Sequence, residues 1–429
     1  MDIPLLLTQY DPLDLPGSEP DPLGFAGAQL ALADNLLPGL GERAVRPRYY
    51  SLICAGLLLG EQGPESLRRA TLMRLERFWA LANVFVAGEE RDPPLDVTHL
   101  RGADYARVRA SNLLERNLDR TTAEFRLLAR QEACGALGVY GESAMALGLL
   151  DGSLSLTERG QRLGQAFISG TELPEELIVA SLDPEQLVSI SELWKWGMRA
   201  HVSGTPAEAE AEALVEALNA DPRRALTAAL LARFPQQEAG EPELQRLARI
   251  ARELPRSPEG RELMEPILAI LAFEESYRLC RLAFERLVWF SRHAPGPGKP
   301  LADFTGDTVM ELVVEKLPAA AAFLHRIVNG LKSPGLKANI SLLLQIVQFV
   351  DAAGAADRGE KLARTVAQRH RELGMGRWTW IEVSPGGHVR PTIPLSRGLG
   401  YEATHPAHIP ASDWRLKAAD ALAAARKAA

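Results

Sequence analysis

Apolar side chains recur at three- and four-residue intervals along most of the chain. This spacing places them on one face of a helix. In residues 64–85, for example, Leu67, Leu75 and Phe78 follow Pro64, a residue that helices tolerate in their first turn. The pattern predicts helices at 25–37, 49–60, 64–85 and 103–117, and several more between 171 and 290 that open with Thr, Asp, Ser or Glu-Pro. The chain is therefore predicted to be mainly α-helical.

The pattern changes in the last quarter of the chain. Further helices are predicted at 306–316, 318–329, 336–353, 357–373 and 412–428. Between the last two, residues 377–383 alternate as a strand does, Ser-Pro-Gly-Gly supplies a turn, and 388–393 alternate again. Two alternating runs joined by a turn predict a β-hairpin at 377–393.

The length of the chain exceeds that of one ordinary hydrophobic core, so we expect several domains. Residues 1–47, with Asp-Pro-Leu at 11–13 and again at 21–23, are predicted to form an extended arm with one short helix. Residues 48–120 and 171–292 are predicted helical domains, with a distinct module at 121–170 between them. The Pro- and Gly-rich run at 295–300 lacks the spacing of a phosphate loop and is predicted to be a linker. It precedes a C-terminal helical domain, 301–429, that carries the hairpin.

Composition excludes some classes of function. The formal net charge of −7 gives no general attraction to nucleic acid. Cys54, Cys134 and Cys280 are odd in number and lie in apolar helical contexts, which predicts buried free thiols and neither a disulfide framework nor a zinc site. The N-terminus lacks a secretory pattern, and the apolar runs are shorter than the roughly 18 residues that span a bilayer. We expect a cytoplasmic protein with no membrane contact, no metal and no cofactor.

The segment 121–170 has the most distinctive pattern. Thr121-Thr-Ala-Glu is a capping box that predicts a helix as far as Ala133, and a second helix is predicted at Gly141–Leu149. A short strand follows, and Leu156-Thr-Glu-Arg-Gly then opens a third helix. The stretch 147–167, LGLLDGSLSLTERGQRLGQAF, resembles the wing and last helix of winged-helix regulators of the MarR and PadR type. The resemblance implies a winged-helix module, which both DNA readers and protein scaffolds use.

Base readout by such a module would place polar or basic side chains on its second helix. Gly141–Leu149 contains no Arg, Lys, Asn or Gln, and acidic residues balance the arginines of the module. Arg159 and Arg162 stay as candidates for nucleic-acid contact. The composition favours a partner-docking use of the module over direct DNA reading.

A second candidate nucleic-acid site is Arg43, Arg46 and Arg48 with Tyr49 and Tyr50. Arginines interleaved with aromatic side chains can hold phosphates while bases stack on the rings. The alternative is that the two tyrosines begin a core helix and the arginines solvate its N-terminus. The sequence leaves both interpretations open.

No pattern of a nucleophile with its base, and no dinucleotide or metal motif, names a reaction. His405 and His408 are separated by Pro406 and do not form a helical metal pair. An enzyme is therefore not predicted, although a site assembled from scattered residues stays open.

The segment 40–170 joins Arg46-Pro-Arg-Tyr-Tyr to the module and weakly resembles uncharacterised bacterial proteins encoded near anti-phage defence genes. The leading hypothesis is a non-catalytic accessory or scaffold subunit that acts with nucleic-acid-handling partners, in bacterial anti-phage defence. It requires protein partners. The alternative is a winged-helix DNA-binding regulator.

Overall fold

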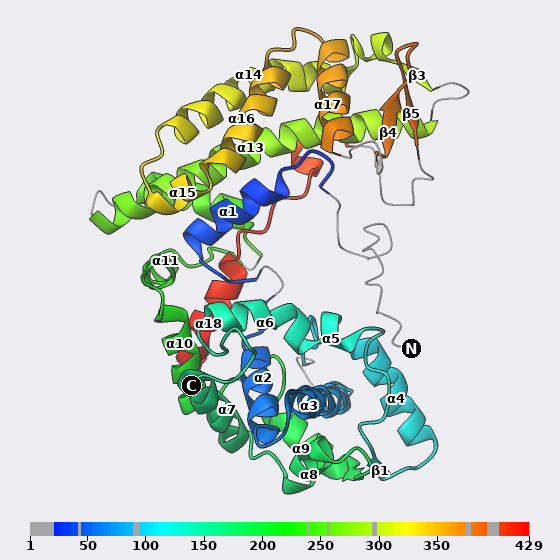
Figure 1. Cartoon of the computed structure of the whole chain (residues 1–429), viewed down its shortest axis with the longest axis vertical. Coiled ribbons are helices and arrows are strands. Elements are labelled where there is room, and N and C mark those ends of the chain that lie inside the picture. Colours follow the sequence, from blue (N-terminus) through cyan, green and yellow to red (C-terminus); the bar gives the residue numbers. More distant parts are fainter. Residues whose placement is uncertain are drawn as a thin grey trace. The chain divides into compact units, whose positions relative to one another are not determined.

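The computed structural model describes residues 21–41, 44–88, 95–238, 240–254, 258–293, 298–373, 379–392 and 403–428. These residues form a mainly helical structure with two small antiparallel sheets, as the sequence predicts (Figure 1). The chain divides into two compact units. Unit 1 contains residues 1–35 and 244–412, and unit 2 contains residues 36–243 and 413–429. Each unit thus combines segments that are far apart in the sequence.

The core of unit 2 is built on α2 (Arg48–Leu59) and α3 (Glu65–Ala87), which pack against each other. Nearly every side chain of α2 is buried, and the helix ends at Gly60 as predicted. Helices α6 (Ala136–Ala146) and α7 (Glu158–Gly170) pack on α2. Helices α4 (Ala103–Glu115), α8 (Glu175–Leu182) and α9 (Ile190–Arg199) pack on α3. The short helix α5 (Gln131–Cys134) precedes α6.

Three more helices complete unit 2. They are α10 (Glu208–Asn219), α11 (Pro222–Arg233) and, from the far end of the chain, α18 (Leu416–Ala428), which packs against both. Glu243, the first residue of α12 (Glu243–Glu253), accepts hydrogen bonds from the backbone amides of Trp414 and Lys417. The C-terminal helix is therefore held in unit 2 by side-chain capping as well as by packing.

Unit 1 is organised around the long helix α13 (Pro258–His293). Helix α14 (Thr308–Asn329) packs along it, followed by α15 (Pro334–Ala338), α16 (Ile340–Gly354) and α17 (Gly359–Leu373). Helix α1 (Ala26–Leu36) follows Phe25, whose ring makes edge contacts with Phe273, Tyr277 and Phe349. These aromatic contacts place Phe25, at the start of α1, in the core of unit 1.

The β-hairpin predicted at 377–393 is confirmed within 379–392, and residues 377, 378 and 393 lie outside the described residues. Strands β4 (Ile381–Val383) and β5 (His388–Pro391) pair antiparallel around the Ser384–Gly387 turn. Strand β3 (Lys299–Pro300) pairs with the other side of β5, and the 3-10 helix η1 (Leu301–Phe304) follows it. The prediction that 295–300 is only a linker is therefore wrong at Lys299 and Pro300; residues 295–297 lie outside the described residues.

The predicted break between helices at 316 and 318 is also wrong, because α14 continues through Pro318. Proline removes one backbone donor from a helix. The burial of Leu317, Ala320 and Ala321 in the contact with neighbouring helices holds the helix together at this point.

The capping-box helix at 121–133 does not form as predicted. Thr121 belongs to β1 (Arg120–Thr121), which pairs with β2 (Val188–Ser189), and helix returns only at Gln131. The Thr122 hydroxyl accepts a hydrogen bond from the Glu124 amide, a local turn contact. Strand pairing at Thr121 thus replaces the helix that the local pattern favours.

The end of the same module agrees with its local prediction. Thr157 caps α7, because its Oγ1 accepts a hydrogen bond from the Gly160 amide at 3.1 Å. The predicted wing strand is reduced to a single antiparallel bridge between Leu150 and Leu156. The resemblance to a winged helix stays a prediction.

Cys54 and Cys280 are free and buried, as predicted, whereas Cys134 is partly exposed. None of the described helices is both long enough and apolar enough to cross a membrane.

Candidate functional site

Two of the arginines predicted as nucleic-acid contacts lie in the segment before α2. Arg43 lies outside the described residues. The Arg46 guanidinium pairs with the Asp96 carboxylate and donates to the Thr98 carbonyl at 3.0 and 3.1 Å. These contacts fix the loop at 96–98 against the start of α2. Arg46 therefore has a structural role in the described fold.

The next three candidates, Arg48, Tyr49 and Tyr50, are buried. Arg48 forms an ion pair with Glu210 at 3.0 Å and donates to the carbonyl of Arg199 at 2.7 Å. Tyr49 stacks on Tyr140 with ring centroids 4.6 Å apart, and Tyr50 meets the same ring edge-on. A ring enclosed in this way cannot receive a base. These residues therefore do not form a stacking platform for bases. They begin a helix in the core of unit 2.

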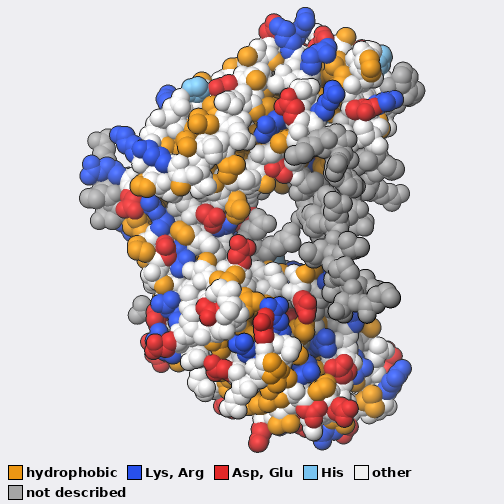
Figure 2. Space-filling model, in the orientation of Figure 1, with side chains coloured by type: hydrophobic (Ala, Val, Ile, Leu, Met, Phe, Trp, Pro, Cys, Tyr) orange, Lys and Arg blue, Asp and Glu red, His pale blue; other side chains and the backbone are white. Residues whose placement is uncertain are grey.

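Arg159 and Arg162 lie on α7 and share one carboxylate. Glu216 of α10 accepts from Arg162 at 2.7 Å and from Arg159 at 3.5 Å. The hydrogen bond from Arg162 is the main cause that lowers the pKa of Glu216 below its ordinary value. On the face shown in Figure 2, basic and acidic side chains of the described residues are interspersed over both units. A nucleic-acid surface on α7 would therefore carry little excess positive charge.

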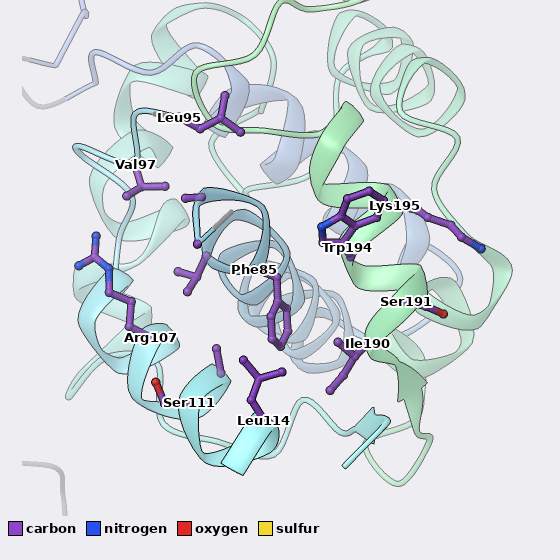
Figure 3. Close-up of a pocket in the computed structure, with 14 residues that line it drawn as sticks. Phe85, Leu95, Val97, Arg107, Ser111, Leu114, Ile190, Ser191, Trp194 and Lys195 are labelled. Atoms are coloured by element: carbon purple, nitrogen blue, oxygen red, sulfur yellow. The ribbon is translucent and has the colours of Figure 1, made fainter. Parts of the chain in front are cut away.

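A different feature of unit 2 is a surface groove with a cavity volume of about 830 Å³. We call it the α3–α4–α9 groove, because its lining comes from the end of α3, from α4, from the start of α9 and from the segment 95–97 (Figure 3). The lining is mostly apolar and consists of Val84, Phe85, Ala87, Gly88, Leu95, Val97, Arg107, Ala110, Ser111, Leu114, Ile190, Ser191, Trp194 and Lys195.

The floor of the groove is the last turns of α3, where Phe85 is partly exposed between the two walls (Figure 3). Helix α9 approaches α3 closely because Gly197 faces the backbone of Ala82. A Cβ atom at Gly197 would lie 2.4 Å from the Ala82 carbonyl oxygen, which is too close for any side chain. This close packing buries Trp196 and leaves Trp194, two residues earlier, on the groove side.

The β1–β2 pair joins the chain segments that follow α4 and precede α9, the helices that form the two walls. Arg120 and Thr121 pair with Ser189 and Val188, and the Ile190 amide donates to the Asp119 carbonyl at 2.8 Å. These bonds join the segment after α4 to the residues that open α9. The spacing of the two groove walls is thus fixed by backbone hydrogen bonds, so the groove is preformed.

The walls present large apolar side chains to solvent. Leu114 of α4 is 60% exposed and Trp194 of α9 is 37% exposed. Most of the large hydrophobic side chains that are exposed among the described residues lie in the same part of the chain, namely Tyr105, Val108, Leu114, Leu118, Val179, Leu182, Leu187, Trp194 and Met198. Single exposed hydrophobic residues are ordinary, whereas Leu114 and Trp194 both line the groove and so add exposed apolar area to its two walls.

The charged side chains that line the groove, among the described residues, are both basic. Arg107 comes from the α4 wall and Lys195 from the α9 wall, on opposite sides of the floor (Figure 3). Arg107 pairs with Asp104 and Lys195 pairs with Glu192, each at 2.7 Å and each within its own helix. Neither of these acidic residues lines the groove. The groove thus has an apolar interior, and each of the two cations in its lining is paired with a carboxylate of the same helix.

Sequence reasoning did not find this groove. Trp194 and Trp196 are two residues apart on α9 and therefore point to different sides of the helix. Trp196 is buried and donates to Thr171 Oγ1, while Trp194 reaches the surface. Two tryptophans two residues apart on a predicted helix were the one sequence signal that an indole would be exposed here.

No protein-family model, curated protein or solved structure matches the chain. The interpretation of the groove therefore depends on its geometry and chemistry.

Proposed function

We propose that the protein is a helical scaffold or accessory subunit that binds a partner protein through the α3–α4–α9 groove. The observation that supports this best is the preformed apolar groove with Trp194 and Leu114 exposed on its two walls. Apolar area removed from water contributes about 25 cal/mol per Å² to association. Tryptophan in particular is enriched among the residues that contribute most to protein interfaces.

The proposal places the partner-docking function on a different surface from the one that the sequence suggested. The predicted winged-helix module lies at 121–170, whereas the groove is formed by helices on either side of it in the sequence. That the partners handle nucleic acid, and that the protein acts in bacterial anti-phage defence, rests on the sequence resemblance alone.

The alternative, direct DNA binding by α7, has less support. Arg159 and Arg162 share Glu216, so their charge is partly neutralised within the protein. Phosphate binding depends on the release of counterions by uncompensated cations. The groove offers a larger, mostly apolar contact surface.

A comparison of matched surface variants tests the proposal. Tagged full-length protein is purified from the cells that produce it, as wild type, Leu114→Glu and Leu30→Glu. Leu30 lies on α1 and is 54% exposed, so its replacement matches Leu114 in chemistry and exposure but lies in unit 1. We expect a specific co-purifying protein to be lost with Leu114→Glu and retained with Leu30→Glu.

The melting temperature of each variant is measured in parallel. Surface substitutions at such positions change stability by about 0.5 kcal/mol or less. If Leu114→Glu retains the same co-purifying proteins as wild type, the groove is not the docking surface and the proposal fails.

A further inference from the structure

We infer that His370 is an acid-sensitive latch, which holds the β4–β5 hairpin on α17 while its imidazole is neutral and releases the start of the hairpin when the imidazole takes up a proton. The inference concerns unit 1 and does not depend on the proposed function of the groove in unit 2. It follows from the two hydrogen bonds of one buried ring, because their partners permit a single protonation state.

The imidazole connects α17 to two other segments of unit 1. His370 lies in the last turn of α17, which packs against β4 (Figure 1), and is only 3% exposed. Its Nε2 atom accepts a hydrogen bond from the backbone amide of Trp380, the residue before β4, at 2.8 Å. Its Nδ1 atom lies 2.9 Å from the backbone carbonyl oxygen of Pro22. One side chain thus holds both the hairpin and the segment before α1.

The two partners decide which ring nitrogen carries the proton. A backbone amide can only donate a hydrogen bond, and a backbone carbonyl can only accept one. Nε2 of His370 is therefore without a proton, and Nδ1 carries one. The neutral imidazole with its proton on Nδ1 is the form that satisfies both partners.

A further proton would bind at Nε2, because Nδ1 is already protonated. The new Nε2–H group and the Trp380 amide would then be two donors that face each other, so their hydrogen bond would be lost. The bond from Nδ1 to Pro22 would remain, because Nδ1 still carries its proton. A buried donor without an acceptor is unfavourable. Protonation of His370 therefore acts on the hairpin and leaves the segment before α1 in place.

The surroundings of the ring favour its neutral form. The Phe284 ring of α13 lies 4.8 Å from the imidazole and the Trp380 ring lies 6.0 Å from it, measured between centroids. Burial is the main cause that lowers the pKa of His370 below its ordinary value; the hydrogen bond to Pro22 opposes this shift, and the charge of Arg281 on α13 adds to it. The hairpin is therefore attached near neutral pH, and acid releases it.

The charges on the elements around α17 agree with this direction. Arg281 is the charged group that acts on the imidazole. A carboxylate beside the ring would instead favour its charged form. Acidic groups on these elements are bonded to other partners, and they are Asp21, Glu285, Asp303, Glu311, Asp351 and Glu382.

The protonation state of the ring is measured by NMR on full-length protein that is isotope-labelled in histidine. The signals of His370 are assigned by their absence from the variant His370→Gln. At about pH 7.5 we expect the chemical shifts of a neutral ring with its proton on Nδ1. Shifts of a ring that carries a proton on Nε2 at this pH would overturn the inference.

Release of the hairpin is measured by hydrogen exchange of the amides of residues 379–392, corrected for the intrinsic effect of pH on exchange. The released ring has the ordinary pKa of about 6.5, whereas the pKa of the attached ring is lower. Protection of these amides in wild type is therefore expected to be constant above about pH 6.5. As the pH falls from there toward the lower pKa, protection should fall by up to about tenfold per pH unit, because release takes up one proton.

Variants without the imidazole isolate its effect. In His370→Gln the protection of the hairpin is expected to be independent of pH over this range, because glutamine does not titrate. His370→Asn is a second variant, whose amide can still donate to Pro22, in case the first fails to fold. The matched control is His325→Gln, which removes a 51% exposed histidine of α14 that pairs with Asp351. This control is expected to keep the wild-type pH dependence.

Two results of the exchange experiment would overturn the inference. One is protection in wild type that stays constant below about pH 6.5, since protonation would then leave the hairpin attached. The other is an equal loss of protection in wild type and in the folded His370 variants, since a different group would then be the acid-sensitive one. Melting temperatures at neutral pH establish which variants are folded.

Discussion

Arg48 of unit 2 lies in a buried ion pair with Glu210, and both side chains are almost completely enclosed. The guanidinium also donates to the carbonyls of Arg199 and His201, so one side chain joins α2 to the end of α9 and to α10. A buried charge is tolerated only when it is paired in this way. Arg48 therefore belongs to the framework of unit 2.

Replacing Arg48 with methionine is expected to destabilise unit 2 by about 3–5 kcal/mol, because Glu210 would be left buried without its partner. Adding Glu210→Leu should restore most of the lost stability, since the unpaired charge is then removed. Chemical denaturation of the full-length protein, followed by tryptophan fluorescence, measures both effects. An unchanged unfolding transition in Arg48→Met would contradict the buried pair.

At the scale of elements, local sequence signals succeeded where tertiary contacts agreed with them. The cap at Thr157, the helix end at Gly60 and the hairpin turn all form as predicted. The capping box at Thr121 failed because Arg120 and Thr121 pair with the distant strand β2. Pro318 failed as a helix end because packing maintains α14 on both sides of it. In each failure a contact between residues far apart in sequence outweighed a local preference.

The start of α18 gives a pH-dependent element. Glu243 accepts from the amides of Trp414 and Lys417, at 2.7 and 2.8 Å, and so caps this helix. Burial, and then the neighbouring Asp413 carboxylate, raise the pKa of Glu243 to about 7, while the bonds from Lys417 and Trp414 and the charge of Lys417 oppose the shift. A pKa raised in the folded state means that the folded protein holds this proton more tightly than the unfolded chain.

The stabilisation from the protonated carboxyl is therefore complete below about pH 4.5 and is lost as the pH rises to about 7. We expect Glu243→Gln to remove this dependence, so that the melting temperature of wild type falls relative to the variant across that range. Because Asp413 and Glu243 interact, the comparison measures the pH dependence of the pair. Thermal unfolding at a series of pH values measures the difference, and a difference that stays constant with pH would contradict the account.

At the scale of the molecule, the groove could not be read from the sequence because its parts are distant along the chain. Residues 84–88, 95–97, 107–114 and 190–195 meet through the packing of α4 and α9 on α3 and the pairing of β1 with β2. For the same reason, the two units are not successive stretches of the chain, as the predicted domains were. Helix α18 packs with α10 and α11, some 200 residues earlier, and α1 belongs with residues after 244.

The candidate residues from the sequence illustrate the same limit. Arginines beside tyrosines at 46–50 are typical both of nucleic-acid contacts and of the start of a core helix, and only the burial of Tyr49 and Tyr50 decides between them. Glu216, which lies on another helix, partly cancels the positive charge of the surface around Arg159 and Arg162. Helical content was predictable because it depends on local spacing, whereas a binding surface depends on which faces remain uncovered.

The central claim is that the α3–α4–α9 groove contacts a partner protein, and site-specific crosslinking tests it most directly. A photo-reactive phenylalanine derivative is placed at Leu114, and at Leu30 as the control, in the full-length protein inside the cells that produce it. Irradiation is predicted to give a discrete crosslinked product from position 114 that is absent from position 30 and is lost when Trp194→Glu is added. No product from position 114, or the same product from both positions, would contradict the account.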